Sequence, residues 1–277
     1  MINITTDKII AYSSICMILR IDKSCSLYVK IQIYLLLVFI LMIKKLSVLF
    51  LFACIFSTAS ISEPLSFREA KTHMPGIFSK LKDAKTIYCG CDIIFYENGY
   101  RPDLESCGYK IRSNSQRANR IEAEHMMPAY TFGKKRQCWQ EGGRKNCSEN
   151  DPEFIKMEGD LHNLYPSIGE VNGDRSNYRF VEKLKGKSPY GKCSVIINTK
   201  KQVASIPKRA KGIVARAYLY MSYTYKIPLT MDQIDLFRYW NRKYRVTRNE
   251  CIRNELIKEI QGNYNPFVKL QCKNFKL

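Results

Sequence analysis

The distribution of cysteines constrains the fold of this chain more than any other feature of its sequence. Eleven cysteines occur among 277 residues, and eight of them lie beyond residue 62: Cys89, Cys91, Cys107, Cys138, Cys147, Cys193, Cys251 and Cys272. An even number in an exported chain is typical of a disulfide framework, and eight cysteines pair in roughly 100 ways. Cys89 and Cys91 are too close to bond easily to each other, so we expect each to pair elsewhere. Zinc binding is less favoured, because the sequence has no Cys-x-x-Cys motif.

The first 62 residues have the pattern of an export signal behind an extension. An almost wholly apolar stretch, residues 31–43, is followed by two lysines, a second apolar run and mostly small residues up to Ser62. Read from Met42, this is a complete secretory signal. A membrane anchor over residues 31–56 would place both lysines in the apolar core, at a cost of several kcal/mol. We therefore favour Met42 as the true start and residues 63–277 as one folded domain, and expect no stable membrane partner after signal removal.

The charge of the chain favours a polyanionic partner. The net charge is +20, and residues 1–62 contribute +4 of it through six Lys/Arg against two Asp/Glu, so +16 remains for residues 63–277. A strongly basic surface attracts nucleic acids, although a generic basic protein would have the same composition. Charge alone therefore does not decide between the two.

Capping boxes mark the starts of several expected helices. In such a box a hydroxyl side chain caps the helix and a Glu or Gln three residues on reaches back. The pairs are Ser66 with Glu69, Ser167 with Glu170, Thr230 with Gln233, and Thr247 with Glu250 in a helix that ends near Gly262. Residues 207–226 also have a helical pattern, and strand-like stretches occur at 86–95, 108–112, 120–125 and 192–199. We expect a single α+β domain with an irregular basic segment at residues 129–158.

The three histidines differ in what surrounds them. His73 lies in the first expected helix without acidic neighbours, which indicates a packing or surface residue. His162, in Asp-Leu-His-Asn-Leu, fits a structural histidine better than a metal ligand. His125 follows Glu124 directly at the end of an expected strand, and histidine is the side chain that titrates near neutrality. A lone Glu-His pair is a weak signal for catalysis.

Several linked motifs strengthen that signal. They are Arg-Ile-Glu-Ala-Glu-His-Met-Met-Pro (residues 120–128), Gly-Gly-Arg-Lys (142–145), Asp-Leu-His-Asn-Leu-Tyr-Pro (160–166) and Gly-Glu-Val-Asn-Gly-Asp-Arg-Ser-Asn (169–177). Together they resemble the bacterial endonuclease I family, periplasmic or secreted non-specific nucleases with a ββα-metal (His-Me finger) site. The resemblance runs from Cys-Gly-Cys-Asp at residue 89 to the Gln-Gly-Asn-x-Asn-Pro near residue 266.

The resemblance implies a metal site made of two protein oxygens. Glu124 and Asn172 would be the ligands, and two oxygens with waters and a phosphate suit Mg²⁺, which keeps much of its hydration. Mn²⁺ and Ca²⁺ are further candidates for the same site. Glu122 and Asp174 are candidates for orienting these ligands, and the sequence does not rank them.

The resemblance also implies the catalytic residues. His125 would be the general base, Arg144 would hold the phosphate, and Glu158 would lie near the metal waters and the leaving group as a general acid acting through water. Without the resemblance, Arg144 and Glu158 would be interpreted as a surface ion pair. A bond between Cys138 and Cys147 around residues 142–145 would hold Arg144 in place.

The leading hypothesis is therefore a non-specific, Mg²⁺-dependent endonuclease. It would cut DNA and also RNA to 5′-phosphate and 3′-hydroxyl ends, because the chemistry needs no 2′-hydroxyl and phosphate contacts carry no base information. The alternatives are a basic nucleic-acid-binding protein with a degenerate site and a membrane-tethered structural protein. We expect a periplasmic or secreted monomer.

Overall fold

The computed structural model describes residues 34–36, 38–39, 42–43, 64–97 and 99–275. The chain divides into two units, Met1–Ile61 and Ser62–Leu277. In the described part of the first unit, short helical stretches occur, and the expected signal sequence lies largely outside the described residues. Within the described residues, no helix has the length and apolar character needed to cross a membrane. The start at Met42 and the boundary at residue 62 stay predictions.

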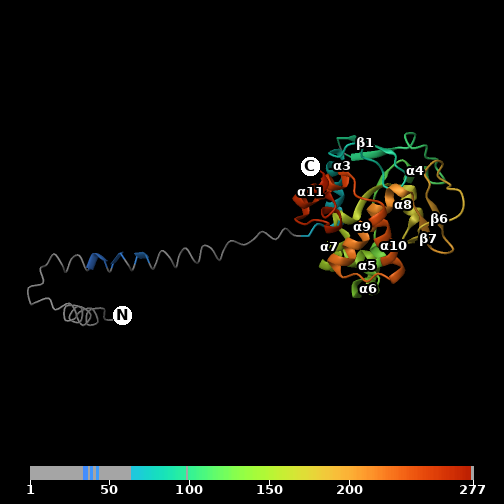
Figure 1. Ribbon diagram of the computed structural model, residues 1–277. Helices are drawn as coiled ribbons and strands as arrows, with labels where there is room; N and C mark the ends of the chain where they lie inside the picture. The colour runs from blue at the N-terminus through green and yellow to red at the C-terminus, as the bar shows by residue number, and fades with distance from the viewer. Residues whose placement is uncertain (1–33, 37, 40–41, 44–63, 98, 276–277) are drawn as a thin grey trace, which may run out of the picture. The chain divides into compact units, whose positions relative to one another are not determined.

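The described residues of the second unit form a mixed α+β domain with three small sheets (Figure 1). β1 (Asp92–Tyr96) pairs antiparallel with β2 (Gly99–Asp103), and β3 (Ile121–His125) pairs antiparallel with β4 (Leu164–Ile168). β7 (Val203–Ser205) is the centre of the third sheet, parallel to β5 (Arg179–Phe180) and antiparallel to β6 (Ile196–Asn198). The α+β class is confirmed.

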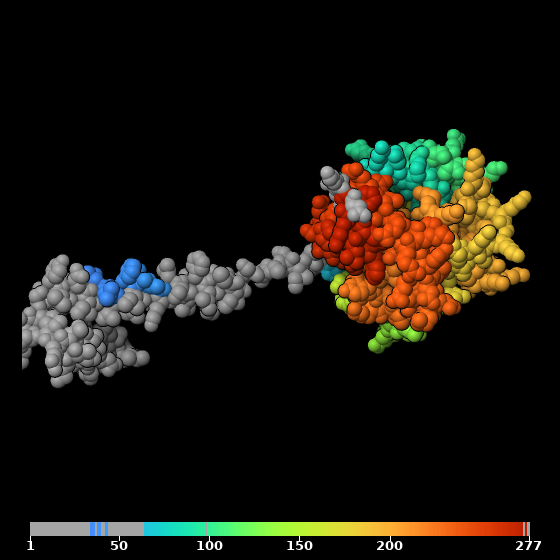
Figure 2. All heavy atoms as spheres, in the orientation of Figure 1, coloured from blue at the N-terminus to red at the C-terminus, as the bar shows by residue number. Residues whose placement is uncertain are grey.

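Helices make up most of the remaining domain. In chain order they are α3 (Phe67–Ser79), α4 (Ser115–Ala118), α5 (Ala129–Gly133), α6 (Gln137–Asn150), α7 (Pro152–Glu158), α8 (Gly169–Arg175), α9 (Lys208–Tyr225), α10 (Met231–Lys243), α11 (Arg248–Gln261) and α12 (Pro266–Lys269), with 3₁₀ turns at Leu161–Asn163 and Cys272–Asn274. The C-terminal helices, orange to red in Figure 2, form one continuous face of the domain. Capping boxes at Ser66, Thr230 and Thr247 begin α3, α10 and α11, as expected, and Gly262 ends α11 at a φ of +86°.

The expected cap at Ser167 is wrong, although a helix follows it. Ser167 belongs to β4, and its hydroxyl donates to the carbonyl of Ile168. Glu170 does not reach back to the helix start: it accepts hydrogen bonds from the backbone amides of Ser113 and Asn114 at 2.7 and 2.6 Å. The carboxylate of Glu170 therefore holds a loop that is distant in sequence.

The expectation of an irregular segment at residues 129–158 is also wrong. Three helices, α5, α6 and α7, occupy it almost completely. α6 is broken at Gly142 and Gly143, and Gly143 has a φ of +67°, which glycine adopts without a Cβ penalty. The break divides α6 into two short helical pieces, which weakens the periodic signal of a helix.

Two of the expected strands are shorter than their sequence patterns, and one is a single bridge. Of residues 86–95 only 92–95 lie in β1, and of 192–199 only 196–198 form β6. Residues 108–112 form one isolated bridge, between Tyr109 and Gly191. The disulfides at Cys89, Cys91, Cys107 and Cys193 fix this part of the chain instead.

All eight cysteines beyond residue 62 form disulfides. The pairs are Cys89–Cys193, Cys91–Cys107, Cys138–Cys147 and Cys251–Cys272. The expected bond between Cys138 and Cys147 is confirmed, and so is the expectation that Cys89 and Cys91 pair elsewhere. No thiolate of these eight is left for a zinc ion.

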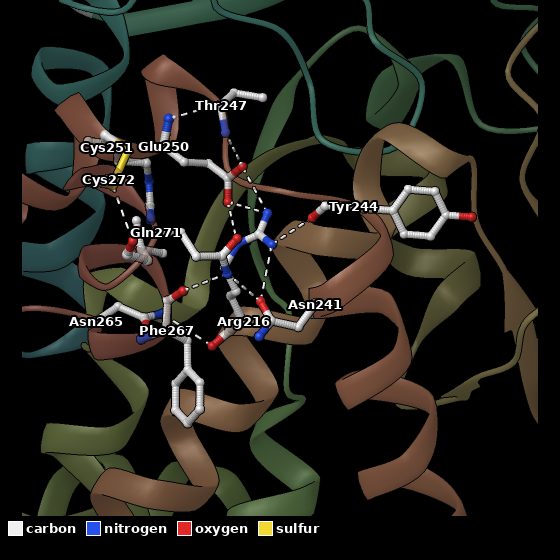
Figure 3. Close-up of polar contacts among 12 residues, drawn as sticks. Arg216, Asn241, Tyr244, Thr247, Glu250, Cys251, Asn265, Phe267, Gln271 and Cys272 are labelled. Carbon is white, nitrogen blue, oxygen red and sulfur yellow. Dashed lines mark hydrogen bonds and ion pairs between the residues drawn. A yellow bond between two sulfur atoms is a disulfide. The ribbon is translucent and has the colours of Figure 1, made fainter. Parts of the chain in front are cut away.

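A buried ion pair joins the C-terminal helices (Figure 3). Arg216 of α9 donates to the carboxylate of Glu250 on α11 at 2.8 and 2.9 Å, and to the carbonyl of Tyr244 at 2.8 Å. The side chains of Arg216 and Glu250 are only 2% and 5% exposed. The Cys251–Cys272 disulfide lies beside this pair. This network supports the domain away from the cleft described next.

Candidate active site

One cleft of about 780 Å³ collects most of the candidate residues. Its lining includes Glu124 and His125 at the end of β3, Asn172 and Arg175 on α8, and Arg144 beyond the break in α6. β3 and β4 form an antiparallel ribbon, and α8 follows β4 directly and packs against both strands. This order of two strands and a helix is compatible with a ββα-metal motif.

Glu124 is held from one side only. It is 2% exposed, and its Oε1 accepts hydrogen bonds from the hydroxyl of Tyr88 and from Nε of Arg175, each at 2.6 Å. Burial raises the pKa of Glu124, while the charge of Arg175 and the two hydrogen bonds act in the opposite direction. Among the described residues no group donates to Oε2. One carboxylate oxygen is therefore available to a ligand in the cleft.

Asn172 is oriented by Glu122. The amide Nδ2 of Asn172 donates to Oε2 of Glu122 at 2.8 Å, and Arg117 and Arg120 in turn bind the Glu122 carboxylate. With Nδ2 fixed in this way, the carbonyl Oδ1 of Asn172 accepts no hydrogen bond from the described part of the chain. The carboxylate of Asp174 accepts hydrogen bonds from Arg112 and Tyr190 and, among the described residues, none from Asn172. Of the two possible orienting carboxylates, Glu122 is the one in contact with a candidate ligand.

These donors fit a hard cation. The free oxygens of Glu124 and Asn172 are a carboxylate and an amide carbonyl, the ligand types that Mg²⁺ takes beside water and phosphate. Within residues 64–97 and 99–275, no three His, Cys, Asp or Glu side chains converge on one point. A site there would thus have few protein ligands, as Mg²⁺ sites commonly do.

The tautomer of His125 follows from its hydrogen bond. Its Nε2 lies 2.8 Å from the backbone carbonyl of Glu158, and because a carbonyl only accepts, Nε2 carries the proton and Nδ1 is left unprotonated. Burial lowers the pKa of His125 to about 3, and the charges of Arg144 and Arg175 act in the same direction. The ring of Phe67 packs 4.7 Å away. The structure thus holds a neutral imidazole at the cleft.

Arg144 and Glu158 form the ion pair that the sequence allowed as an alternative. Nε of Arg144 donates to Oε1 of Glu158 at 2.6 Å, and Ser148 donates to Oε2 at 2.7 Å. The Arg144 side chain is 46% exposed and lines the cleft, whereas that of Glu158 is 4% exposed and does not line it. The contacts indicate that Glu158 positions Arg144, whose terminal nitrogens make no hydrogen bond to any described residue. The general-acid role of Glu158 stays a prediction.

The other two histidines lie outside the cleft. Nε2 of His162 donates to the carbonyl of Asn263 at 3.1 Å, and its ring packs edge-on against Tyr220 at 4.8 Å. His162 is 2% exposed, which fits the structural role expected of it. His73 is a half-buried residue of α3 and does not line the cleft.

Sequence reasoning missed Arg175, although it lies inside one of the quoted motifs. Arg175 is 1% exposed and binds both Glu124 and the carbonyl of His125. Its Nη1 is buried and has no hydrogen-bond partner in the described part of the chain. The aromatic lining from Phe67, Tyr130 and Trp139 was missed as well. The sequence offers only weak signals for these residues, since their roles depend on packing between distant segments.

Comparison with known proteins agrees with the motifs. The family model of endonuclease I matches residues 67–272. A periplasmic deoxyribonuclease of Aeromonas hydrophila is 48% identical over 78% of this chain and 92% of its own length. An endonuclease-1 of Buchnera aphidicola is 45% identical over 82% of this chain and 95% of its own length. An extracellular endonuclease of Pseudomonas fluorescens is 27% identical over 78% of this chain and 92% of its own length. The matched region contains the whole cleft, and the chain belongs to the endonuclease I family.

Proposed function

We propose that this protein is a metal-dependent endonuclease that hydrolyses phosphodiester bonds in DNA and RNA, leaving 5′-phosphate and 3′-hydroxyl ends. The observation that carries the proposal is the hydrogen bond between Nε2 of His125 and the carbonyl of Glu158, which leaves Nδ1 unprotonated on a residue that lines an arginine-rich cleft. The relatives named deoxyribonuclease and endonuclease support a nuclease. Metal dependence and activity on RNA are the finer parts of the proposal.

Different residues of the cleft have different roles in the reaction. Neutral His125 takes a proton at Nδ1 from the attacking water, and the carbonyl of Glu158 steadies the imidazolium that forms, through the Nε2 proton. Arg144 donates from its terminal nitrogens to the phosphate, where negative charge increases in the transition state. The carboxylate of Glu158 and the ring of Phe67 keep the guanidinium of Arg144 in place, the ring centroid lying 5.3 Å from its central carbon.

Glu124 and Asn172 would hold the cation. Bound there, Mg²⁺ would supply Lewis-acid stabilisation of the phosphate and of the departing 3′ oxygen. Arg175 reduces the free-energy cost of keeping the buried Glu124 carboxylate ionised. Glu122 accepts a hydrogen bond from Nδ2 of Asn172 and so leaves Oδ1 for the cation. The arrangement leaves one oxygen on each ligand for the cation.

The charge of the cleft fits a nucleic acid backbone. Lys71, Arg117, Arg120, Arg144 and Arg175 line it, against Glu122 and Glu124. Contacts of this kind neutralise phosphates and carry no information on base sequence. We therefore expect cleavage with low sequence specificity and a strong dependence on salt.

Digestion of supercoiled plasmid with Mg²⁺ and with EDTA tests the proposal. Cleavage should require the cation, and ligation of the products should require no added 5′ kinase step. Glu124→Ala and Asn172→Ala should each raise the Mg²⁺ concentration needed, because each removes one of two protein oxygens. An unchanged Mg²⁺ titration for both variants would rule out this ligand pair. Plasmid binding without cleavage under all conditions would favour the degenerate binding protein.

We also propose that the protein is exported as a monomer to the periplasm or beyond. Four disulfides form and persist in oxidising compartments. Relatives named periplasmic and extracellular deoxyribonuclease support the same location. N-terminal sequencing of the secreted protein tests cleavage close to residue 62, and light scattering tests the monomer.

A further inference from the structure

We infer that Tyr130 and Trp139 form a stacking subsite for an unpaired nucleobase next to the catalytic residues. The inference rests on the proposed function, because it places the base of a nucleotide beside the phosphate that is cleaved. It adds a substrate preference: single-stranded segments should bind more tightly than intact duplex of the same length.

Tyr130 is an exposed aromatic residue in the lining of the cleft. It lies on α5, five residues beyond His125 in the sequence, and lines the same cleft. Its side chain is 43% exposed. The ammonium group of Lys134 lies 4.9 Å from the centre of the ring. The ammonium lies over one face of the ring, so a base would stack on the ring surface that remains exposed, with the charge of Lys134 close to its phosphate.

Trp139 supports Tyr130 rigidly. The two ring centroids are 6.0 Å apart at 73°, an edge-to-face contact. The indole also packs against Phe154 at 5.8 Å and against the backbone of Gly133, where a Cβ atom would come within 2.3 Å of it. Because only glycine leaves this space, α5 and α6 approach closely and hold Trp139 in one position. A fixed aromatic pair loses little conformational entropy when it binds a planar ligand.

The chemistry of this pair favours a base over a phosphate. Phosphates are bound by the arginines and lysines of the cleft, and an exposed aromatic ring adds nothing to that contact except through its hydroxyl. The faces of bases are covered in a duplex and free in a single strand, so an aromatic surface gains binding energy only from an unstacked base. The subsite is therefore specific for unpaired nucleotides and tolerant of base identity.

Tryptophan fluorescence offers a direct measurement. The chain has two tryptophans, and Trp240 is 0% exposed, so a base that stacks in the cleft should quench only Trp139. The titration uses the full domain with its disulfides intact and EDTA present to prevent cleavage. The probes are a short single-stranded oligodeoxyribonucleotide and the same strand in a duplex clamped by G·C pairs. Quenching by the single strand, lost in Trp139→Phe, is the expected result.

Variants of Tyr130 separate stacking from hydrogen bonding. Tyr130→Ala should weaken single-strand binding by about tenfold, within the range for one stacked base, and leave duplex binding unchanged. Tyr130→Phe keeps the ring and should bind as the wild type does. Tyr223→Ala is a matched control: Tyr223 is 61% exposed, Lys226 lies 5.0 Å over its ring, and it does not line the cleft.

Several results would overturn the inference. One is an equal effect of Tyr130→Ala on single strand and duplex, and another is no effect on either. Tyr130→Phe binding as weakly as Tyr130→Ala would show that the hydroxyl, and not the ring, makes the contact. Plasmid cleavage with Mg²⁺ is measured in parallel, so a failure of the proposed nuclease activity is visible separately from a failure of stacking.

Discussion

Removing the Cys138–Cys147 disulfide should inactivate the protein without unfolding it. The bond joins the two halves of α6 across the break at Gly142 and Gly143, and Arg144 follows the break directly. Without the bond, the break contains glycines that adopt many conformations, and a hydrogen bond from Nδ2 of Asn146 to the carbonyl of Cys138 still spans it. The guanidinium of Arg144 would then lose its fixed position relative to His125.

The loss of stability and the loss of kcat can both be estimated. The bond spans nine residues in sequence, and a loop of that size contributes roughly 2.5–3 kcal/mol to stability in the chain-entropy description. A domain with about 5–15 kcal/mol in total stays folded after this loss. Displacing a catalytic group by about 1 Å can cost on the order of 100-fold in rate, so kcat should fall by about that factor.

The assay is plasmid nicking by Cys138→Ser/Cys147→Ser, with urea unfolding measured on the same sample. The matched control is Cys251→Ser/Cys272→Ser, whose bond spans 21 residues beside the network of Figure 3. The longer loop should cost at least as much stability, roughly 3–3.5 kcal/mol, and leave kcat unchanged. Equal losses of kcat in both variants, or none in the first, would refute the reasoning. Reduction of the wild type under native conditions should likewise abolish cleavage, with free thiols counted by mass.

His125→Ala should lower turnover by more than about 100-fold while sparing DNA binding, as nicking and filter-binding assays would show; retention of a tenth of the activity would argue against the base. Glu158→Ala and Arg144→Ala should be strongly non-additive in kcat if Glu158 acts by positioning Arg144, whereas additive losses would support an independent general acid. Glu250→Ala should destabilise the domain by about 3–5 kcal/mol in urea, because it leaves a buried arginine unpaired. Glu255→Ala, on the same helix but in an exposed pair, should cost less than about 1 kcal/mol.

Local signals predicted the helix starts of this fold well. The boxes at Ser66, Thr230 and Thr247 need only residues within one turn, and all three cap helices in the structure. The same pattern misled at Ser167, because the carboxylate of Glu170 has stronger partners in the loop at residues 112–114 and in Tyr109. A capping box competes with every other donor that the fold brings near, and a single sequence does not show those donors.

The helices of segment 129–158 could not be predicted from local sequence signals. Its helices are short, and α5 and α6 begin at Pro128 and Arg136 without any side-chain cap. Their stability comes from tertiary packing and from the Cys138–Cys147 bond, as is general for short helices. The bond itself was predicted from the need to hold Arg144. The function of the segment was thus easier to infer than its secondary structure.

Some features of the candidate site are visible in the sequence, and others depend on contacts that the fold creates. The adjacency of Glu124 and His125 at the end of one strand is visible in the sequence, and both residues line the cleft in the structure. The hydrogen bond from Asn172 to Glu122 and the burial of Arg175 beside Glu124 join residues about 50 positions apart. Such contacts fix the orientation of an amide and the charge of a carboxylate, and neither follows from residue type alone.

Glu158 joins the two halves of the site, and it does so through different atoms. Its backbone carbonyl fixes the tautomer of His125, while its carboxylate fixes Arg144. The first contact survives any substitution of the side chain, and the second does not. The base is therefore supported by the main chain of α7 and the ladder of β3 and β4, whereas Arg144 is held by the Glu158 carboxylate, the ring of Phe67 and the disulfide across α6. Because the disulfide holds the segment that carries Arg144, reduction should displace the arginine first and leave a neutral histidine that has no positioned phosphate to act on.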